Sequence, residues 1–170
     1  MLARNETIFE WVLYAAATVL CLAVQEAFLQ RFTLWGVIPF IYPLLAAIPA
    51  TYEGTVPGTV FALAVGVVCD LILPAPLPCF YTLVFPAVGL CAALLAQSWL
   101  PAGFLCSLVV SAAAFLFTDL FAALLLWLEG RSAWGAAFFL MLREFCVTIP
   151  LSIPATLLYR AVFRRAHRDD

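Results

Sequence analysis

Six long apolar runs, broken by short polar or proline-rich segments, account for most of this 170-residue chain. A helix needs about 20 apolar residues to cross the hydrocarbon core of a bilayer. The runs approach or exceed that length, and they lie at residues 8–29, 34–50, 56–73, 80–99, 104–128 and 134–163. This pattern predicts six membrane-spanning helices, joined by loops too short to hold a soluble domain.

The composition leads to the same class of protein. Hydrophobic residues make up 66% of the chain and charged residues 11%, whereas soluble domains are nearer half apolar and a quarter charged. Lipid must therefore cover much of the apolar surface. We expect an all-α, polytopic integral membrane protein in which residues 1–170 form a single transmembrane domain, a compact bundle of six helices.

The arginines indicate an orientation. All eight basic residues are Arg, and four of them lie in the last eleven positions: Arg160, Arg164, Arg165 and Arg168. Six spans place both termini on one side, which then carries Arg4 and the four tail arginines, against Arg31 and Arg131 on the other side. Basic residues gather on the cytoplasmic side of membrane proteins. We expect cytoplasmic termini, with the basic tail as a topology signal and no nucleic-acid partner.

The second apolar run contains three prolines, Pro39, Pro43 and Pro49. Proline inside a helix removes a backbone hydrogen bond and bends the helix unless neighbours satisfy the freed carbonyl groups. We therefore expect a bent or partly re-entrant helix over residues 34–50.

A ridge of small residues runs along the third apolar run. Four of them recur at intervals of four, between Glu53 and Asp70: Gly54, Gly58, Ala62 and Gly66. This spacing places them on one side of a helix, where small side chains let a neighbouring backbone approach closely. Packing within the chain is the more common use of such a ridge. A partner-binding face that includes Glu53 and Asp70 is the functional alternative.

Charged residues also fall inside the predicted spans. Asp119 and Arg143 each lie nine residues from the outer end of their helices, about 13 Å deep, so an ion pair between them is feasible. Removing Asp119 should then destabilise the bundle more than removing Asp70. Glu144 points about 100° away from Arg143 and needs another partner. Glu26 and Asp70 lie near outer helix ends, where an interfacial and a functional role are both open.

Motifs for catalysis or metal binding do not appear in the sequence. There is no Lys, His167 is the only histidine, and the six cysteines form no CxxC pair. GxSxG and HExxH motifs are missing too. We therefore expect no enzymatic activity, no cofactor and no metal. Whether Cys69 and Cys79 form a disulfide stays open.

The stretch from Glu53 to Pro74 resembles the rod shape-determining protein MreD family. The resemblance lies in Glu53, Gly54, Gly58, Gly66 and Asp70, followed by Leu71, Leu73 and Pro74, and in an acidic residue, Asp119, in the fifth helix. It implies a non-enzymatic protein of the bacterial inner membrane that binds the bitopic protein MreC. Together with the actin-like MreB, such proteins help to place and activate the peptidoglycan synthase made of RodA and a class B penicillin-binding protein.

A second resemblance leads to another class of function. Substrate-binding subunits of energy-coupling-factor vitamin transporters are six-helix proteins of similar size, and the MreD fold is similar to theirs. Their ligand pocket lies on the outer side, where the predicted helices gather five charged residues: Glu26, Asp70, Asp119, Arg143 and Glu144. The alternative is therefore a vitamin-binding transporter subunit.

Overall fold

The computed structural model describes residues 2–31, 33–130 and 134–166, with side chains described from residue 8. This part of the chain is helical and contains no strand, only an isolated bridge between Leu34 and Val37. The α-helices are α1 (Leu2–Ala27), α2 (Tyr42–Glu53), α3 (Thr55–Ile72), α4 (Phe80–Ser98), α5 (Phe104–Leu128), α6 (Trp134–Thr148) and α7 (Ser152–Ala166). Two short 3₁₀ helices, η1 (Leu29–Arg31) and η2 (Ile149–Leu151), follow α1 and α6.

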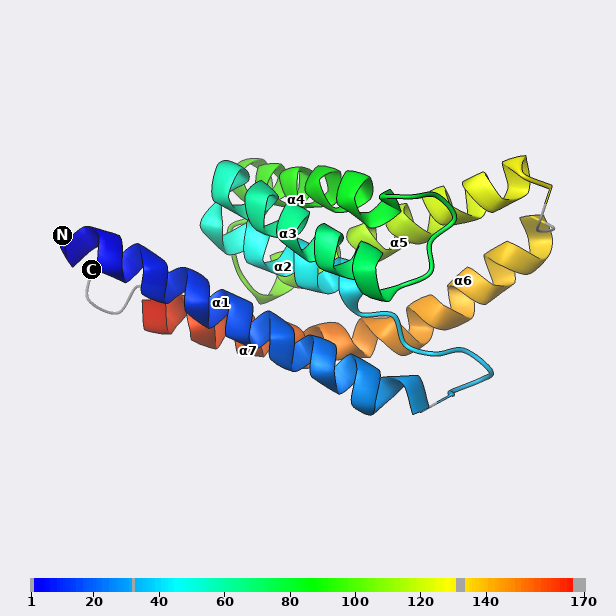
Figure 1. Cartoon of the computed structure of the whole chain (residues 1–170), viewed down its shortest axis with the longest axis horizontal. Coiled ribbons are helices and arrows are strands. Elements are labelled where there is room, and N and C mark those ends of the chain that lie inside the picture. Colours follow the sequence, from blue (N-terminus) through cyan, green and yellow to red (C-terminus); the bar gives the residue numbers. More distant parts are fainter. Residues whose placement is uncertain (1, 32, 131–133, 167–170) are drawn as a thin grey trace.

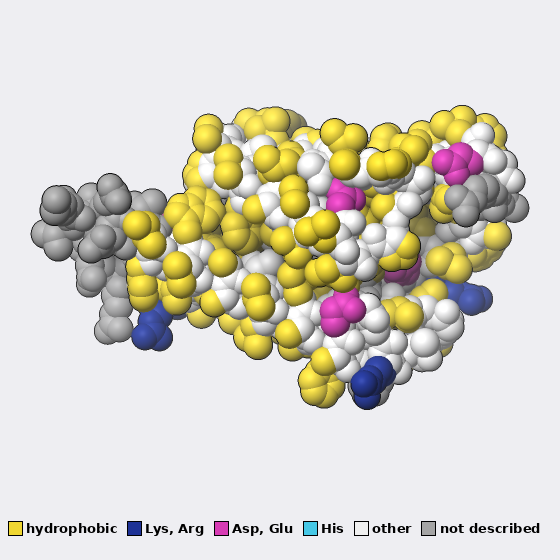
Figure 2. Space-filling model, viewed as in Figure 1, with side chains coloured by type: hydrophobic (Ala, Val, Ile, Leu, Met, Phe, Trp, Pro, Cys, Tyr) yellow, Lys and Arg dark blue, Asp and Glu magenta, His cyan; other side chains and the backbone are white. Residues whose placement is uncertain are grey.

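Five helical segments are long and apolar enough to cross a membrane. They are Ile8–Arg31, Thr55–Ile72, Phe80–Ser98, Phe104–Leu128 and Trp134–Ala166. Hydrophobic side chains cover most of the face seen in Figure 2, as expected for a surface in contact with lipid. These features agree with an all-α, multi-pass membrane protein, with five candidate spanning helices in place of the six predicted, because residues 34–50 do not form one.

The helices run back and forth along one direction (Figure 1). α1 and α7 lie side by side, and α2, α3 and α4 pack together in the middle of the molecule. We call the end of the bundle that contains the start of α1, the α2–α3 turn and the end of α7 the terminal end, and the opposite end the far end. The start of α1 and the end of α7 therefore lie at the same end of the bundle.

The second segment differs from its predicted boundaries. Residues 34–41 are not helical, and α2 covers only Tyr42–Glu53. Trp35 and Gly36 adopt positive φ angles in a turn, and Pro39 cannot donate a backbone hydrogen bond. Pro43 lies in the first turn of α2, where proline is well tolerated. With 12 residues, α2 is about 18 Å long, too short to cross the hydrocarbon core as a helix.

α2 forms the core of the bundle instead. Ten of its 12 residues, from Tyr42 to Thr51, are buried. A helix that is apolar on all sides is stable when other elements surround it, and α2 contacts α3, α4, α5 and α7. The short helix thus joins the other segments into one body.

The non-helical backbone before α2 is satisfied by buried side chains. The Gln25 side chain donates a hydrogen bond to the Pro39 carbonyl (2.7 Å), and the Phe40 amide donates to the Thr148 hydroxyl (3.0 Å). Both of these polar side chains are at most 2% exposed. Irregular backbone at membrane depth is tolerated when protein groups take up its hydrogen bonds. Gln25 and Thr148 thereby hold this segment between α1 and the end of α6.

The ridge of small residues lies inside the bundle. A Cβ atom on Gly58 would come within 2.6 Å of the Ala50 Cα atom of α2, and one on Gly66 within 2.6 Å of the Tyr81 carbonyl oxygen of α4. Ala62 is fully buried and faces Gly89 of α4. The glycines therefore allow α3 to contact α2 and α4 nearly backbone to backbone, and this face of α3 is occupied within the chain.

Candidate functional site

Asp70 joins the end of α3 to the start of α4. Its carboxylate accepts hydrogen bonds from the Tyr81 amide (3.0 Å), the Thr82 amide (2.7 Å) and the Thr82 hydroxyl (2.5 Å). Amide groups in the first turn of a helix have no partner within the helix, and a negative charge there is also favoured by the helix dipole. Asp70 therefore caps α4 across the proline-rich loop of residues 73–79.

Glu26 plays a comparable part at the end of α1. Its carboxylate accepts hydrogen bonds from the Tyr42 hydroxyl, at the start of α2, and from the Gln30 side chain (2.6 Å). Tyr42 is 1% exposed, so this bond satisfies a phenol hydroxyl that is carried into the core. Glu26 thus ties the end of α1 to the start of the buried helix.

The structure does not bring Asp119 and Arg143 together. Within the described residues no ion pair joins them, and Arg143 is exposed. Glu144, half-buried, is the α6 residue in electrostatic contact with Asp119. The more buried positions of α6 include position 144 and leave out 143; they are Ala137, Met141, Glu144, Phe145, Val147 and Thr148.

Tyr81 lies at the centre of these acidic groups. It is 7% exposed and within electrostatic range of Asp70, Asp119 and Glu144. Its ring also contacts Phe40, with 6.2 Å between the ring centroids. The far half of the bundle therefore brings together acidic side chains from α3, α5 and α6 around a packed aromatic residue.

Glu53 and Gly54 lie at the terminal end of the bundle, apart from this acidic group. Glu53 is the last residue of α2 and is in electrostatic contact with the buried Tyr14 of α1. Gly54 has a φ angle of +88°, a conformation that L side chains rarely adopt, and it forms the one-residue turn into α3. The motif from Glu53 to Asp70 thus extends from one end of α3 to the other.

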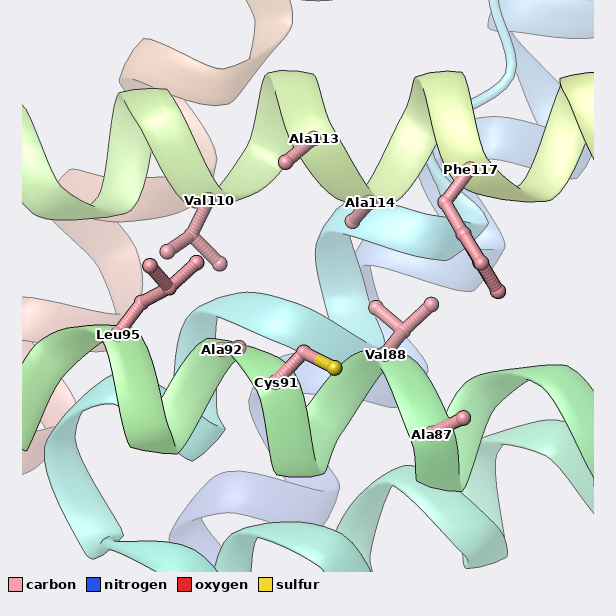
Figure 3. A pocket seen from close by; sticks show the side chains of 9 residues that line it. All are labelled: Ala87, Val88, Cys91, Ala92, Leu95, Val110, Ala113, Ala114 and Phe117. Carbon is pink, nitrogen blue, oxygen red and sulfur yellow. The ribbon is translucent and has the colours of Figure 1, made fainter.

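A groove between α4 and α5 opens on the lipid-facing surface (Figure 3). It has a volume of about 190 Å³ and an entirely apolar set of lining residues: Ala87, Val88, Cys91, Ala92, Leu95, Val110, Ala113, Ala114 and Phe117. Alanines and a cysteine form its floor and sides, while Leu95, Val110 and Phe117 project into the space between the helices. An apolar groove with small side chains is suited to close packing against another helix in lipid.

The structure also bears on the cysteines and on possible metal ligands. Cys69 is buried and Cys79 is exposed, and both are free thiols. In the described part of the chain, no three His, Cys, Asp or Glu residues are grouped so that they could hold a metal ion.

Two structural residues, Gln25 and Thr148, were not singled out from the sequence. The sequence does indicate that these two residues matter, because each is an uncharged polar residue within an apolar run. Such a residue in a membrane helix needs a hydrogen-bond partner. The identity of that partner depends on the fold, since Gln25 and Thr148 bond to backbone groups 14 and 108 residues away.

Comparison of the chain with family models, with curated proteins and with solved structures found no match.

Proposed function

We propose that this protein is a non-enzymatic component of the bacterial cell-elongation machinery, with the role that its resemblance to the MreD family implies. It would lie in the inner membrane with both termini in the cytoplasm. There it would bind an MreC-like bitopic protein and help to organise peptidoglycan synthesis by RodA and a class B penicillin-binding protein.

One structural observation supports this proposal best. The residues that carry the resemblance, from Glu53 to Pro74, form a single unit made of the α2–α3 turn, the ridge that contacts α2 and α4, and the Asp70 cap on α4. The motif therefore shapes the fold around α4. Gly58 and Gly66 have packing partners on α2 and α4, and Asp70 has its capping partners on α4, so these residues are accounted for by their part in the fold.

The surface that binds the partner must be one that the helices of this chain leave exposed. Since the ridge is filled by α2 and α4, a partner helix has to bind elsewhere on α4 or its neighbours. The α4–α5 groove offers an exposed, apolar surface with the small side chains of Ala87, Cys91 and Ala113 (Figure 3). We place the membrane helix of the MreC-like partner there, since small residues let two helices pack closely in lipid.

The test is co-purification from native membranes in mild detergent, followed by mass spectrometry of proteins and small molecules. We expect an MreC-like bitopic protein and cell-wall synthases. The variant Ala87→Leu with Ala113→Leu should fill the groove and reduce partner recovery at least several-fold. Ala136→Leu is the matched control, because Ala136 is exposed on α6, away from the groove.

The other outcomes decide against parts of the proposal. Unchanged partner recovery with the groove variant would remove the groove as the binding surface. Recovery of ATPase and transmembrane coupling subunits, or of a bound vitamin, would instead identify a substrate-binding subunit of an energy-coupling-factor transporter. In that case the shape-determination proposal would fall as a whole.

A further inference from the structure

The last two turns of α7 expose a basic hollow. It is lined by Leu157, Arg160, Ala161, Arg164 and Arg165. Arg160 and Arg164 are four residues apart and therefore neighbours on one face of the helix, and the small Ala161 lies beside them in the lining of the hollow. Figure 2 shows basic side chains at the terminal end, where α7 finishes. The hollow exists because alanine leaves room among longer side chains.

An exposed apolar strip leads into this hollow from the membrane side. Leu157 is 54% exposed and Ile153 is 43% exposed, at helical intervals before Arg160 and Ala161. The opposite face of α7 is buried in the bundle through Ser152, Ala155, Thr156 and Tyr159. One face of α7 therefore changes from apolar to basic along its length while remaining open to its surroundings.

The hollow carries the three arginines of the last two turns of α7. Among the described residues that line it, none is acidic. Arg side chains at a helix end extend toward the membrane surface, where their charge meets lipid headgroups. The charge of the hollow therefore favours an anionic ligand, and Leu157 and Ile153 favour a ligand that also has an apolar part.

We propose that this face of α7 is a binding site for an anionic phospholipid. The phosphate of the lipid would accept hydrogen bonds from the guanidinium groups of Arg160 and Arg164 beside Ala161, and an acyl chain would lie along Leu157 and Ile153. Arginine suits this role because its planar group binds phosphate through two parallel hydrogen bonds. The proposal does not depend on the function proposed above.

The test is native mass spectrometry of the purified full-length protein during titration with phosphatidylglycerol, and with phosphatidylcholine of the same acyl chains. We expect phosphatidylglycerol to bind more tightly. The variant Arg160→Gln with Arg164→Gln should bind it roughly tenfold more weakly, since each arginine near an anionic surface contributes to attraction. Ala161→Leu should also weaken binding, because it fills the hollow without changing the charge.

The matched control is Arg31→Gln with Arg143→Gln, which makes the same change in charge at two exposed arginines on η1 and α6. Its phosphatidylglycerol affinity should stay within about twofold of the unaltered protein. An equal loss in this control, or no loss in the Arg160 and Arg164 variant, would overturn the proposal. Displacement of the lipid by millimolar inorganic phosphate would show that the site takes the free anion and not the phospholipid.

Discussion

At the scale of single residues, the carboxylates differ more in what they contact than in how deeply they lie. Asp70 accepts three hydrogen bonds at the start of α4, whereas Asp119 has another acidic side chain, Glu144, as its charged neighbour. A carboxylate that satisfies helix amides stabilises the fold. One that sits beside a like charge in apolar surroundings does not. The two residues should therefore respond differently to substitution.

We predict that Asp70→Ala lowers the free energy of unfolding by about 2–4 kcal/mol, because it leaves the first turn of α4 without its acceptor. Asp119→Ala should cost less than about 1 kcal/mol, since it removes no hydrogen bond described in the structure. This order is the reverse of the one expected from the sequence. Thermal unfolding of both variants in the same mild detergent measures the difference. A lower unfolding midpoint for Asp119→Ala than for Asp70→Ala would contradict this order.

The sequence could locate these carboxylates but not their neighbours. Counting residues placed Asp119 and Arg143 at one depth, which made the opposite charges look like a pair. The contact depends on the rotation of α6, and the 100° between successive residues brings Glu144 and not Arg143 toward α5. The apolar residues around Arg143 do not fix that rotation, because in lipid both faces of a helix are apolar.

At the scale of elements, the contact between α3 and α4 depends on glycine. At Gly66 the backbones meet so closely that a Cβ atom would be 2.6 Å from the Tyr81 carbonyl oxygen. Backbone atoms cannot move aside as a flexible side chain can, so the helices would have to separate. We predict that Gly66→Ala lowers the free energy of unfolding by about 1–3 kcal/mol, as overpacking of a filled core does.

The matched control is Gly135→Ala, near the start of α6. Nothing lies within 4 Å of a Cβ atom there, so the added methyl group meets open space. Alanine is also the better helix former. Unfolding midpoints of the two variants, measured side by side, should show a loss for Gly66→Ala and none for Gly135→Ala. Equal midpoints would mean that α3 and α4 are not held at the spacing seen here.

The elements themselves were predictable to different degrees. Apolar length located α3, α4 and α5 to within one or two residues at each end. For residues 34–50 the same rule failed at the start, because apolar length does not distinguish helix from irregular backbone when buried side chains satisfy that backbone. The prolines were the useful signal, since they indicated that this segment would not be a regular helix.

At the scale of the whole molecule, the two ends of the bundle differ in chemistry. The far half contains Glu26, Asp70, Asp119 and Glu144, while the exposed arginines of α7 lie at the terminal end. The 19 residues of α4 extend for about 28 Å between the two ends, close to the thickness of the hydrocarbon core. Residues that flank α4 should therefore lie on opposite sides of the membrane.

The orientation can be tested with two cysteine positions on either side of α4. Cys79 is exposed just before α4, and Ser98 is exposed at its last residue. In single-cysteine variants, we predict that a membrane-impermeant maleimide labels Cys79 in intact spheroplasts. It should label Ser98→Cys only after permeabilisation if the basic terminal end of the bundle faces the cytoplasm, as the gathering of basic residues on the cytoplasmic side of membrane proteins predicts. The reverse pattern would place the termini outside, and labelling of both positions before permeabilisation would contradict the assignment of α4 as a span.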